Sequence, residues 1–293
     1  MILINMAPMR SGSRARPMTQ QPLASSGRSR MRVLRRLRWT VAGLAVVAVA
    51  AGAPKSADLS QRDLARLAAD PERLRAADLA GKDLSALDLS ELDLRGATLP
   101  SVDLFGADLT RTDLRGAKLV GARLDRAVII GTSFADADLS QASLLRVAAF
   151  SGLAASRDEA PNFARAKLAG AIIIGRLAHA DLRGADLRHA RIGQTARPDR
   201  NPMIEALTPT DLTASDMSGA RLEDADLSGV RLAFASLVGA NLRGAKLHRA
   251  DLTGANLTGA DLTGADLTGA VLDQALVGGA LGLDPSLLAS ARP

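Results

Sequence analysis

Residues 250–269 read ADLTG-ANLTG-ADLTG-ADLTG, so one five-residue unit occurs four times in succession. Outward from this stretch, leucine or another apolar residue recurs at every fifth position from Leu212 to Leu272 and from Leu79 to Leu144. A period of five suits neither regular element, because a helix advances about 100° per residue and a strand turns successive side chains to opposite faces. The chain must therefore bend within each unit to keep every leucine on one side.

Each unit has inward and outward positions. In a short extended piece, the central leucine and the residue two before it point the same way, and that earlier residue is most often alanine. Aspartate precedes the leucine, whereas Thr, Ser or Arg and then glycine follow it, which places polar residues outside and glycine at a tight corner. The sequence therefore predicts a narrow coil whose core is a ladder of leucines.

The motif Ala-(Asp/Asn)-Leu-X-X resembles that of the pentapeptide-repeat proteins, and the resemblance covers residues 77–277. It implies an all-β fold, a right-handed quadrilateral β-helix with four repeats in each coil. We count 33 central residues, including a one-residue slip between Ile173 and Leu177, which corresponds to about eight coils. The resemblance implies little about function, because the roles within the family are diverse.

The repeats divide the chain into segments, and a solenoid needs both of its ends covered. Ser60 to Asp63 resembles a capping box, and Asp70-Pro71 and Asp284-Pro285 are typical helix starts. We expect short helical caps at both ends, with the C-terminal helix as an alternative homodimer interface. The expected segments are a disordered basic extension (1–30), a signal peptide or membrane anchor (31–53), a helical N-terminal cap (54–76), the β-helix (77–277) with insertions at 145–165 and 193–209, and a C-terminal cap helix (278–293).

The net charge of +6 comes from the N-terminal leader and not from the repeats. Residues 1–53 contain nine arginines and no acidic residue, so residues 54–293 carry 28 basic and 31 acidic side chains, a net charge of −3. A basic patch is the electrostatic signature of nucleic-acid binding. Because the repeats carry no basic excess, we expect no nucleic-acid partner.

The leader predicts export. A basic run over 28–38 precedes fifteen residues, 39–53, that are apolar and end in small side chains. This order is typical of a cleaved secretory signal peptide, and the apolar run is shorter than the roughly 20 residues that span a bilayer. We expect an extracytoplasmic protein, periplasmic or secreted, with an uncleaved membrane anchor through 39–53 as the alternative. Met31 is a second candidate start.

Aspartates that lie twenty residues apart should stack on successive coils about 4.8 Å apart. In the first coils this arrangement gives an acidic patch on three sides. An acidic face for a basic partner is one interpretation. The other is that each carboxylate accepts local backbone N–H groups, as a constant position of the repeat. The candidate partner-binding residues of this patch are Asp83, Asp88, Asp93, Asp103, Asp108 and Asp113.

The insertions and the phenylalanines supply the remaining candidate contacts. Phe105 and Phe234 fall at outward positions, whereas Phe134 takes a leucine position and should be buried. If each insertion joins adjacent sides, the two lie at diagonally opposite corners, which argues against a shared pocket. Loops often carry function. The candidate residues are Phe105, then Arg157, Asp158 and Glu159 in the first insertion, and Arg197, Asp199 and Arg200 in the second.

No pattern in the chain indicates catalysis. There is no cysteine, and the spacing of His179, His189 and His248 does not suit a metal site. Nucleophile, phosphate-loop and dinucleotide motifs are absent from suitable contexts. We expect no enzymatic activity, no cofactor and no bound metal.

Two function hypotheses remain. The leader favours an exported, non-enzymatic scaffold that contacts an unidentified protein or the cell envelope. The family resemblance also implies a cytoplasmic DNA mimic that binds a type II topoisomerase, although a net charge of −3 departs from that pattern.

Overall fold

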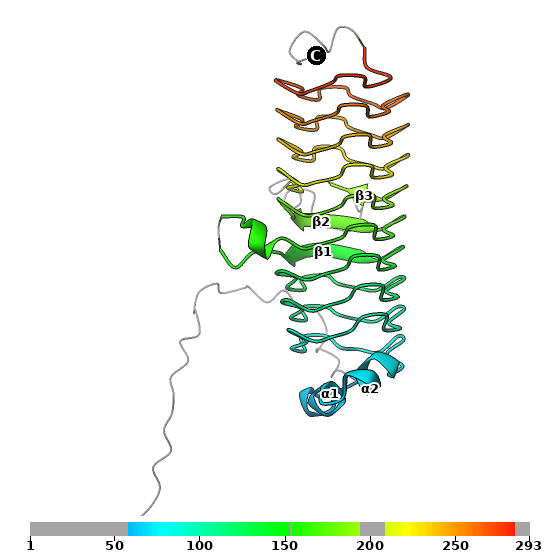
Figure 1. Ribbon diagram of the computed structural model, residues 1–293, viewed down its shortest axis with the longest axis vertical. Coiled ribbons are helices and arrows are strands. Elements are labelled where there is room, and N and C mark those ends of the chain that lie inside the picture. Colours follow the sequence, from blue (N-terminus) through cyan, green and yellow to red (C-terminus); the bar gives the residue numbers. More distant parts are fainter. Residues whose placement is uncertain (1–57, 153, 194–208, 285–293) are drawn as a thin grey trace, which may run out of the picture. The chain divides into compact units, whose positions relative to one another are not determined.

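The computed structural model describes residues 58–152, 154–193 and 209–284. The expected basic extension and leader (1–53), most of the second insertion and the expected C-terminal helix lie outside these residues. Within them the chain winds into stacked coils (Figure 1). The family β-helix inferred from the repeat is therefore the architecture of this part of the chain.

Four columns of parallel bridges join the coils. In each column, the residue before a central apolar residue pairs with its counterpart on the next coil. We number the sides of the coil one to four, with side one carrying Leu79. The column of side one runs through Thr98, Lys118, Asp138, Lys167, Asp186, Arg221, Asn241, Asp261 and Leu281.

Backbone hydrogen bonds run along the solenoid from coil to coil. The N–H of Leu242 donates to the carbonyl of Asp261 at 2.7 Å, and the N–H of Asp261 donates to the carbonyl of Ala240 at 3.0 Å. Between sides, the chain turns through a residue with positive φ, such as Gly259 at +68° or Arg249 at +55°. Glycine adopts this conformation without strain, which explains its frequency at the corner.

The interior consists of the two inward positions of each repeat. The central leucines are buried, and so are most of the residues two before them, as the repeat predicts; Leu242 and Ala240 are 0% and 1% exposed. Phe134 is also fully buried, as predicted. Each buried leucine contributes about 1.5–3 kcal/mol of hydrophobic free energy before the loss of chain entropy. The core is a column of apolar side chains that runs through successive coils.

Two short helices precede the first coil. They are α1 (Gln61–Ala68) and α2 (Pro71–Ala76). Both begin where the sequence predicts: Ser60 and Asp63 form a reciprocal capping box, and Asp70 caps α2. Leu64 and Leu74, each 2% exposed, join the core of the coils. The apolar faces of α1 and α2 thereby pack on the first coil.

The middle coils contain the regular strands of the structure. These are β1 (Ser143–Ala148), β2 (Ile172–Arg176) and β3 (Arg191–Ile192), which pair in parallel in the order β1-β2-β3. The pairing of β1 with β2 shifts by one residue between Leu145 and Val147. The shift lies opposite the corner after Ile173, where the repeat of β2 is one residue short. Gly175 fits this shortened corner because a Cβ there would lie 3.3 Å from the Cγ2 of Val147. A bulge on β1 therefore absorbs the slip.

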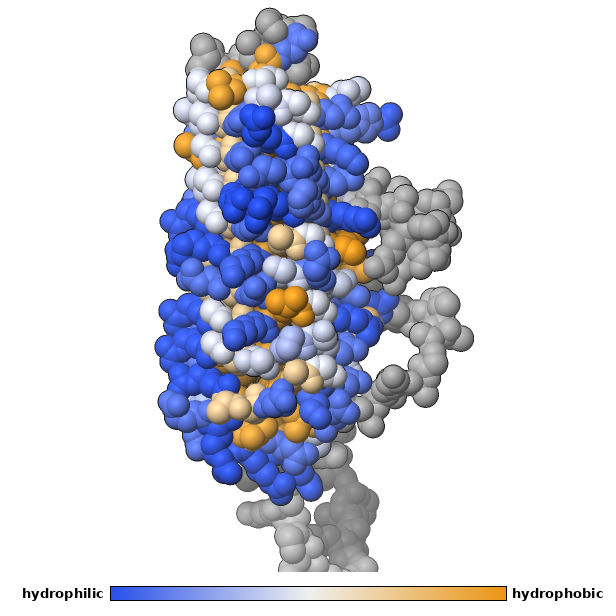
Figure 2. Space-filling model, turned by 90° about the vertical axis from the view of Figure 1, so that its right-hand side faces the viewer, coloured by the Kyte–Doolittle hydropathy of each residue, from blue (hydrophilic) through white to orange (hydrophobic). Residues whose placement is uncertain are grey.

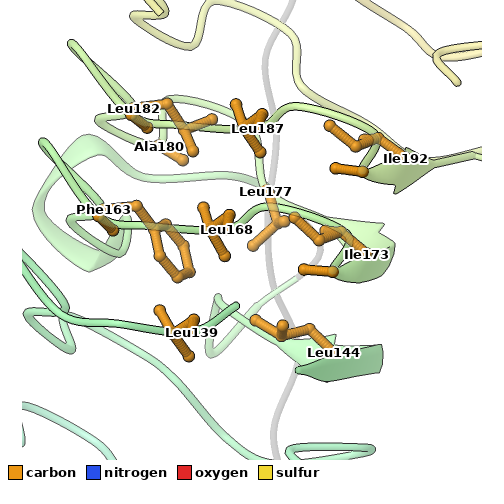
Figure 3. Close-up of a cluster of buried hydrophobic side chains, with 14 of the residues drawn as sticks. Leu139, Leu144, Phe163, Leu168, Ile173, Leu177, Ala180, Leu182, Leu187 and Ile192 are labelled. Atoms are coloured by element: carbon orange, nitrogen blue, oxygen red, sulfur yellow. The ribbon is translucent and has the colours of Figure 1, made fainter. Parts of the chain in front are cut away.

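The first insertion is shorter than the predicted 145–165. Residues up to Ala148 continue the ladder in β1, and Phe163 occupies a central position, 2% exposed and stacked on Phe134 with ring centroids 4.9 Å apart. Figure 3 shows Phe163 pointing inward with Leu168 and the neighbouring leucines. The bridge partners Ser133 and Asn162 are 29 residues apart instead of twenty, so the extra length is nine residues.

The expected diagonal placement of the two insertions is wrong. Ala148 bridges Val128 on side three and Asn162 bridges Ser133 on side four, so the first insertion leaves at the corner between these sides. The second begins after β3, on side two, and the chain resumes on side three, where Asp211 bridges Arg176. The two corners are therefore adjacent. The prediction failed because it left Ala149 and Phe163 out of the count of sides.

Candidate functional site

The predicted acidic stacks are present in the first coils. Asp83 bridges Asp103, Asp88 bridges Asp108, and Asp93 bridges Asp113. Their chemistry matches the second interpretation, because each carboxylate accepts the N–H two residues further on, as Asp108 does from Thr110 at 2.9 Å. The same bond recurs beyond the patch, for example from Thr253 to Asp251 at 3.0 Å. Aspartate at this position closes the corner of the repeat.

Arginines further neutralise the stacked aspartates. The guanidinium of Arg95 bonds both oxygens of Asp93, at 2.8 and 2.7 Å, and Arg115 does the same for Asp113. Arg123 bonds Asp103 at 2.7 Å. The hydrogen bond from Arg95 lowers the pKa of Asp93 to about 2. The three sides therefore do not present a uniformly negative surface.

Phe105 lies at its predicted outward position but is half-buried. The guanidinium carbons of Arg123 and Arg126 lie 4.4 and 5.5 Å from the centroid of its ring. Cations at this distance interact favourably with an aromatic face. The ring of Phe105 is thus partly engaged within the chain, and the chain offers a better contact residue in Phe234, which is 65% exposed.

The described part of the first insertion is held against the coil. The carbonyl of Glu159 accepts the N–H of Gly131 at 2.7 Å, and its carboxylate accepts the N–H of Ser151 at 2.9 Å. The hydroxyl of Ser151 also donates to this carboxylate and lowers the pKa of Glu159. Arg157 and Asp158, in the short 3-10 helix η1 (Arg157–Glu159), are exposed. Arg197, Asp199 and Arg200 lie outside the described residues.

A groove beside this insertion brings together residues that sequence reasoning did not connect. It has a volume of about 590 Å³, is open to solvent, and is bordered by Arg157, His179 and Phe234, with Ser215, Asp216 and Arg183 also in its lining. Backbone bonds order its corner: His179 donates to Thr213, Ala214 to Ala233, and Phe234 to Thr253. The groove therefore lies along the corner between sides three and four, where the first insertion leaves.

The charges in the groove are unequally paired. The guanidinium of Arg183 bonds both oxygens of Asp181, at 2.9 and 2.6 Å, and its Nε lies 3.8 Å from a carboxylate oxygen of Asp216. The hydrogen bond from Arg183 lowers the pKa of Asp181. Arg157 forms no ion pair with another residue of the described ranges. One unpaired cation therefore remains at the edge of the groove.

Two polar atoms near the groove lack partners among the described residues. The Nδ1 of His179 and the Oγ of Ser215 are buried without a hydrogen bond. Buried polar groups normally have a partner. Neither atom is exposed, and Ser215 takes the inward position two residues before Met217, so these atoms do not open onto the groove.

The sequence contained a signal for this groove. His179 and Phe234 both stand two residues after a central leucine on the same side, but they are 55 positions apart. Only a count that includes Ala149 and Phe163 shows that this corner is the one where the first insertion leaves. In the described ranges no cluster of three or more His, Asp or Glu residues could hold a metal ion, and no helix is long and apolar enough to cross a membrane.

The surface seen in Figure 2 is largely hydrophilic, with apolar residues scattered between polar ones. The interior leaves little space: the cavity among Phe163, Leu177 and Leu212 measures about 10 Å³. Any binding by the described coils must therefore use side chains on their outer surface.

Comparisons with known proteins identify what the chain is similar to. A family profile described as pentapeptide repeats matches in eight copies, including residues 73–106, 107–144, 207–244 and 235–274. No curated protein shows a significant match.

Three solved structures illustrate the similarity. HetL, a pentapeptide repeat protein involved in heterocyst differentiation regulation from the cyanobacterium Nostoc sp. strain PCC 7120, is 28% identical over 75% of this chain and 95% of its own, with a TM-score of 0.34. A pentapeptide repeat protein from the Arabidopsis thaliana thylakoid lumen is 24% identical over 39% of this chain and 71% of its own, with a TM-score of 0.27. QnrB1, a plasmid-mediated fluoroquinolone resistance protein, is 22% identical over 71% of this chain and 91% of its own, with a TM-score of 0.24.

Proposed function

Because the chain belongs to the pentapeptide-repeat family, we propose that it is a non-enzymatic β-helical scaffold that binds another protein outside the cytoplasm. The groove at the corner between sides three and four carries the binding part of this proposal. It combines an exposed aromatic ring with an unpaired guanidinium on a framework of stacked coils. A framework of this kind holds surface side chains in fixed positions, which favours recognition.

The hydrogen bonds made by the titratable carboxylates support the proposal of a non-catalytic role. Most of the carboxylates with a lowered pKa accept bonds from a neighbouring Arg, Ser or Thr at the corner of a repeat, as Asp261 does from Thr263. General acids and bases instead need a pKa close to the working pH and a place beside a bound substrate. These carboxylates close corners of the coil.

The extracytoplasmic location rests on the leader sequence, in which a basic run precedes apolar residues 39–53. Cell fractionation of the protein at its natural level, followed by N-terminal sequencing, tests it. We expect an extracytoplasmic species that begins near Ala51 or Pro54. An intact chain that is soluble in the cytoplasm would refute the export.

The second candidate is a cytoplasmic mimic of DNA that binds a type II topoisomerase. The stacked aspartates of the first coils favour it, since they repeat a negative charge along the solenoid. The arginine partners of Asp93, Asp103 and Asp113 weaken that pattern. A DNA-supercoiling assay with gyrase separates the two candidates, because the scaffold proposal expects no inhibition and no protection by the purified chain.

A further inference from the structure

We propose that the groove beside the first insertion binds an extended peptide segment of a partner protein, and that this segment presents a carboxylate next to an aromatic or aliphatic side chain. The inference deepens the proposed scaffold function and rests on it. It assigns a partner chemistry to Arg157, His179 and Phe234, which line the groove together.

Phe234 forms the apolar part of the groove. The chain has five phenylalanines; Phe134 and Phe163 are in the core, Phe105 and Phe150 lie under arginines, and Phe234 is 65% exposed. The Phe234 ring lies over Gly254, where a Cβ would come within 2.7 Å of two ring carbons. The absence of a side chain at Gly254 therefore gives the ring its place on the next coil. An exposed aromatic ring in a fixed position suits the apolar side chain of a partner.

The charge of the groove selects an acidic partner. Arg183 is occupied by Asp181 through two hydrogen bonds and lies near Asp216, whereas Arg157 has no ion-pair partner within the described ranges. A carboxylate can accept two parallel bonds from a guanidinium of this kind. A basic side chain would instead meet Asp181, which is bonded by Arg183, and Asp216, which accepts the N–H of Ser218 and lies 3.8 Å from Arg183.

The openness of the groove favours a peptide over a small metabolite. Small-molecule sites usually enclose most of the ligand surface. This groove is open along the corner of the solenoid, over the coils that contribute His179, Ala214 and Phe234. An extended segment can follow that corner and place successive residues against successive coils.

Selection from a random library of displayed peptides against the purified full chain tests the inference. We expect enriched peptides with Asp or Glu within two residues of Phe, Trp or Leu. The dissociation constant of a synthetic copy should rise at least tenfold with Phe234→Ala and with Arg157→Ala. Both side chains are exposed, so these variants should fold. Val238→Ala is the matched control, because Val238 is exposed on side four but does not line the groove.

Enrichment of basic peptides, no enrichment, or binding that survives both groove variants would overturn the inference. Self-association that Phe234→Ala abolishes would assign the groove to a second copy, and peptide binding that appears only after deletion of 194–208 would assign it to the chain itself; both contradict the proposal. Its failure is distinguishable from failure of the scaffold function. A protein that is exported and binds a partner equally well through both groove variants retains that function but places the interface elsewhere.

Discussion

The coils after Asp211 and the coils between Ser143 and Ile192 share one interior but differ in length and surface. After Asp211, bridge partners are twenty residues apart without exception, as in Asp211 with Arg231. In the earlier coils the separation is 29 at Asn162 and nineteen at Asp181. The central leucines and most of the alanines two residues before them are nonetheless buried in both regions. The ladder therefore tolerates changes of length, provided that they occur at the corners.

The surfaces of the two regions follow from this difference. The regular coils repeat Asp or Asn, Thr and Gly at their outward positions, and the Thr N–H bonds the side chain of the Asp or Asn two residues earlier, as Thr268 does to Asp266. The interrupted coils carry His179 and an insertion at the corner between sides three and four, and Arg183 on side four also lines the groove. The groove lies where the two regions meet, with Phe234 from the regular coils. Departures from the repeat thus create the distinctive side-chain chemistry of the molecule.

The largest expected loss of stability comes from a change to the interior of the coils between Ser143 and Ile192. Replacing Phe163 by alanine removes a buried ring that stacks on Phe134, and we expect the free energy of unfolding to fall by about 3–5 kcal/mol. Urea denaturation followed by circular dichroism measures it, with Leu242→Ala, at about 2–5 kcal/mol, as the control from the regular coils. A loss below about 1 kcal/mol would contradict the placement of Phe163 in the ladder.

The corners should differ in how they accept a methyl group. At Gly175, in the shortened corner, a Cβ would lie 3.3 Å from Val147, so Gly175→Ala should destabilise the fold by about 1–3 kcal/mol through overpacking. At Gly264, in a regular corner, the added Cβ has open space but φ is +73°, and Gly264→Ala should cost about 1 kcal/mol. Thermal unfolding of both variants compares them. Equal small losses would mean that the slip is accommodated elsewhere than at Gly175.

Acid should weaken the first coils through Asp93. Its pKa in the folded protein is about 2, below the ordinary 3.8, because Arg95 donates to the carboxylate. A lowered pKa stabilises the fold at pH values above the ordinary pKa, and this contribution is lost as the pH falls from about 4 toward 2. Unfolding midpoints measured across that range should decline less steeply in Asp93→Asn. An unchanged slope would show that Asp93 has the same pKa in the folded and unfolded chain.

Removal of the first insertion should have the smallest effect on the free energy of unfolding. Deleting residues 151–159 restores the twenty-residue spacing between Ser133 and Asn162. It also places the carbonyl of Phe150 where the carbonyl of Glu159 now accepts the N–H of Gly131. Loop length has a weak influence on closure entropy, so the free energy of unfolding should change by less than about 1 kcal/mol. Calorimetry of the deleted protein checks this. A drop of several degrees in the unfolding midpoint would mean that the insertion supports the coil.

The sequence predicted the fold because the period of five leaves one way to bury every leucine. It also predicted the stacked aspartates, the start of both N-terminal helices and the burial of Phe134. It misplaced the first insertion because Ala149 and Phe163 take central positions next to an irregular stretch, and these two missed units rotated the following segments to other sides. The groove depended on that count, since the corner shared by His179 and Phe234 coincides with the exit of the first insertion only after both missed units are included.

Hydrogen exchange of the full chain, read by mass spectrometry, tests most directly the central claim that the ladder continues unbroken past the first insertion. We expect slow exchange of the N–H groups of the central residues on both sides of the first insertion. Phe163 and Leu168, which donate to Asp181 and Asp186, should match Leu237 and Leu242 in the regular coils. Fast exchange at Phe163 and Leu168, with protection only in the regular coils, would contradict it.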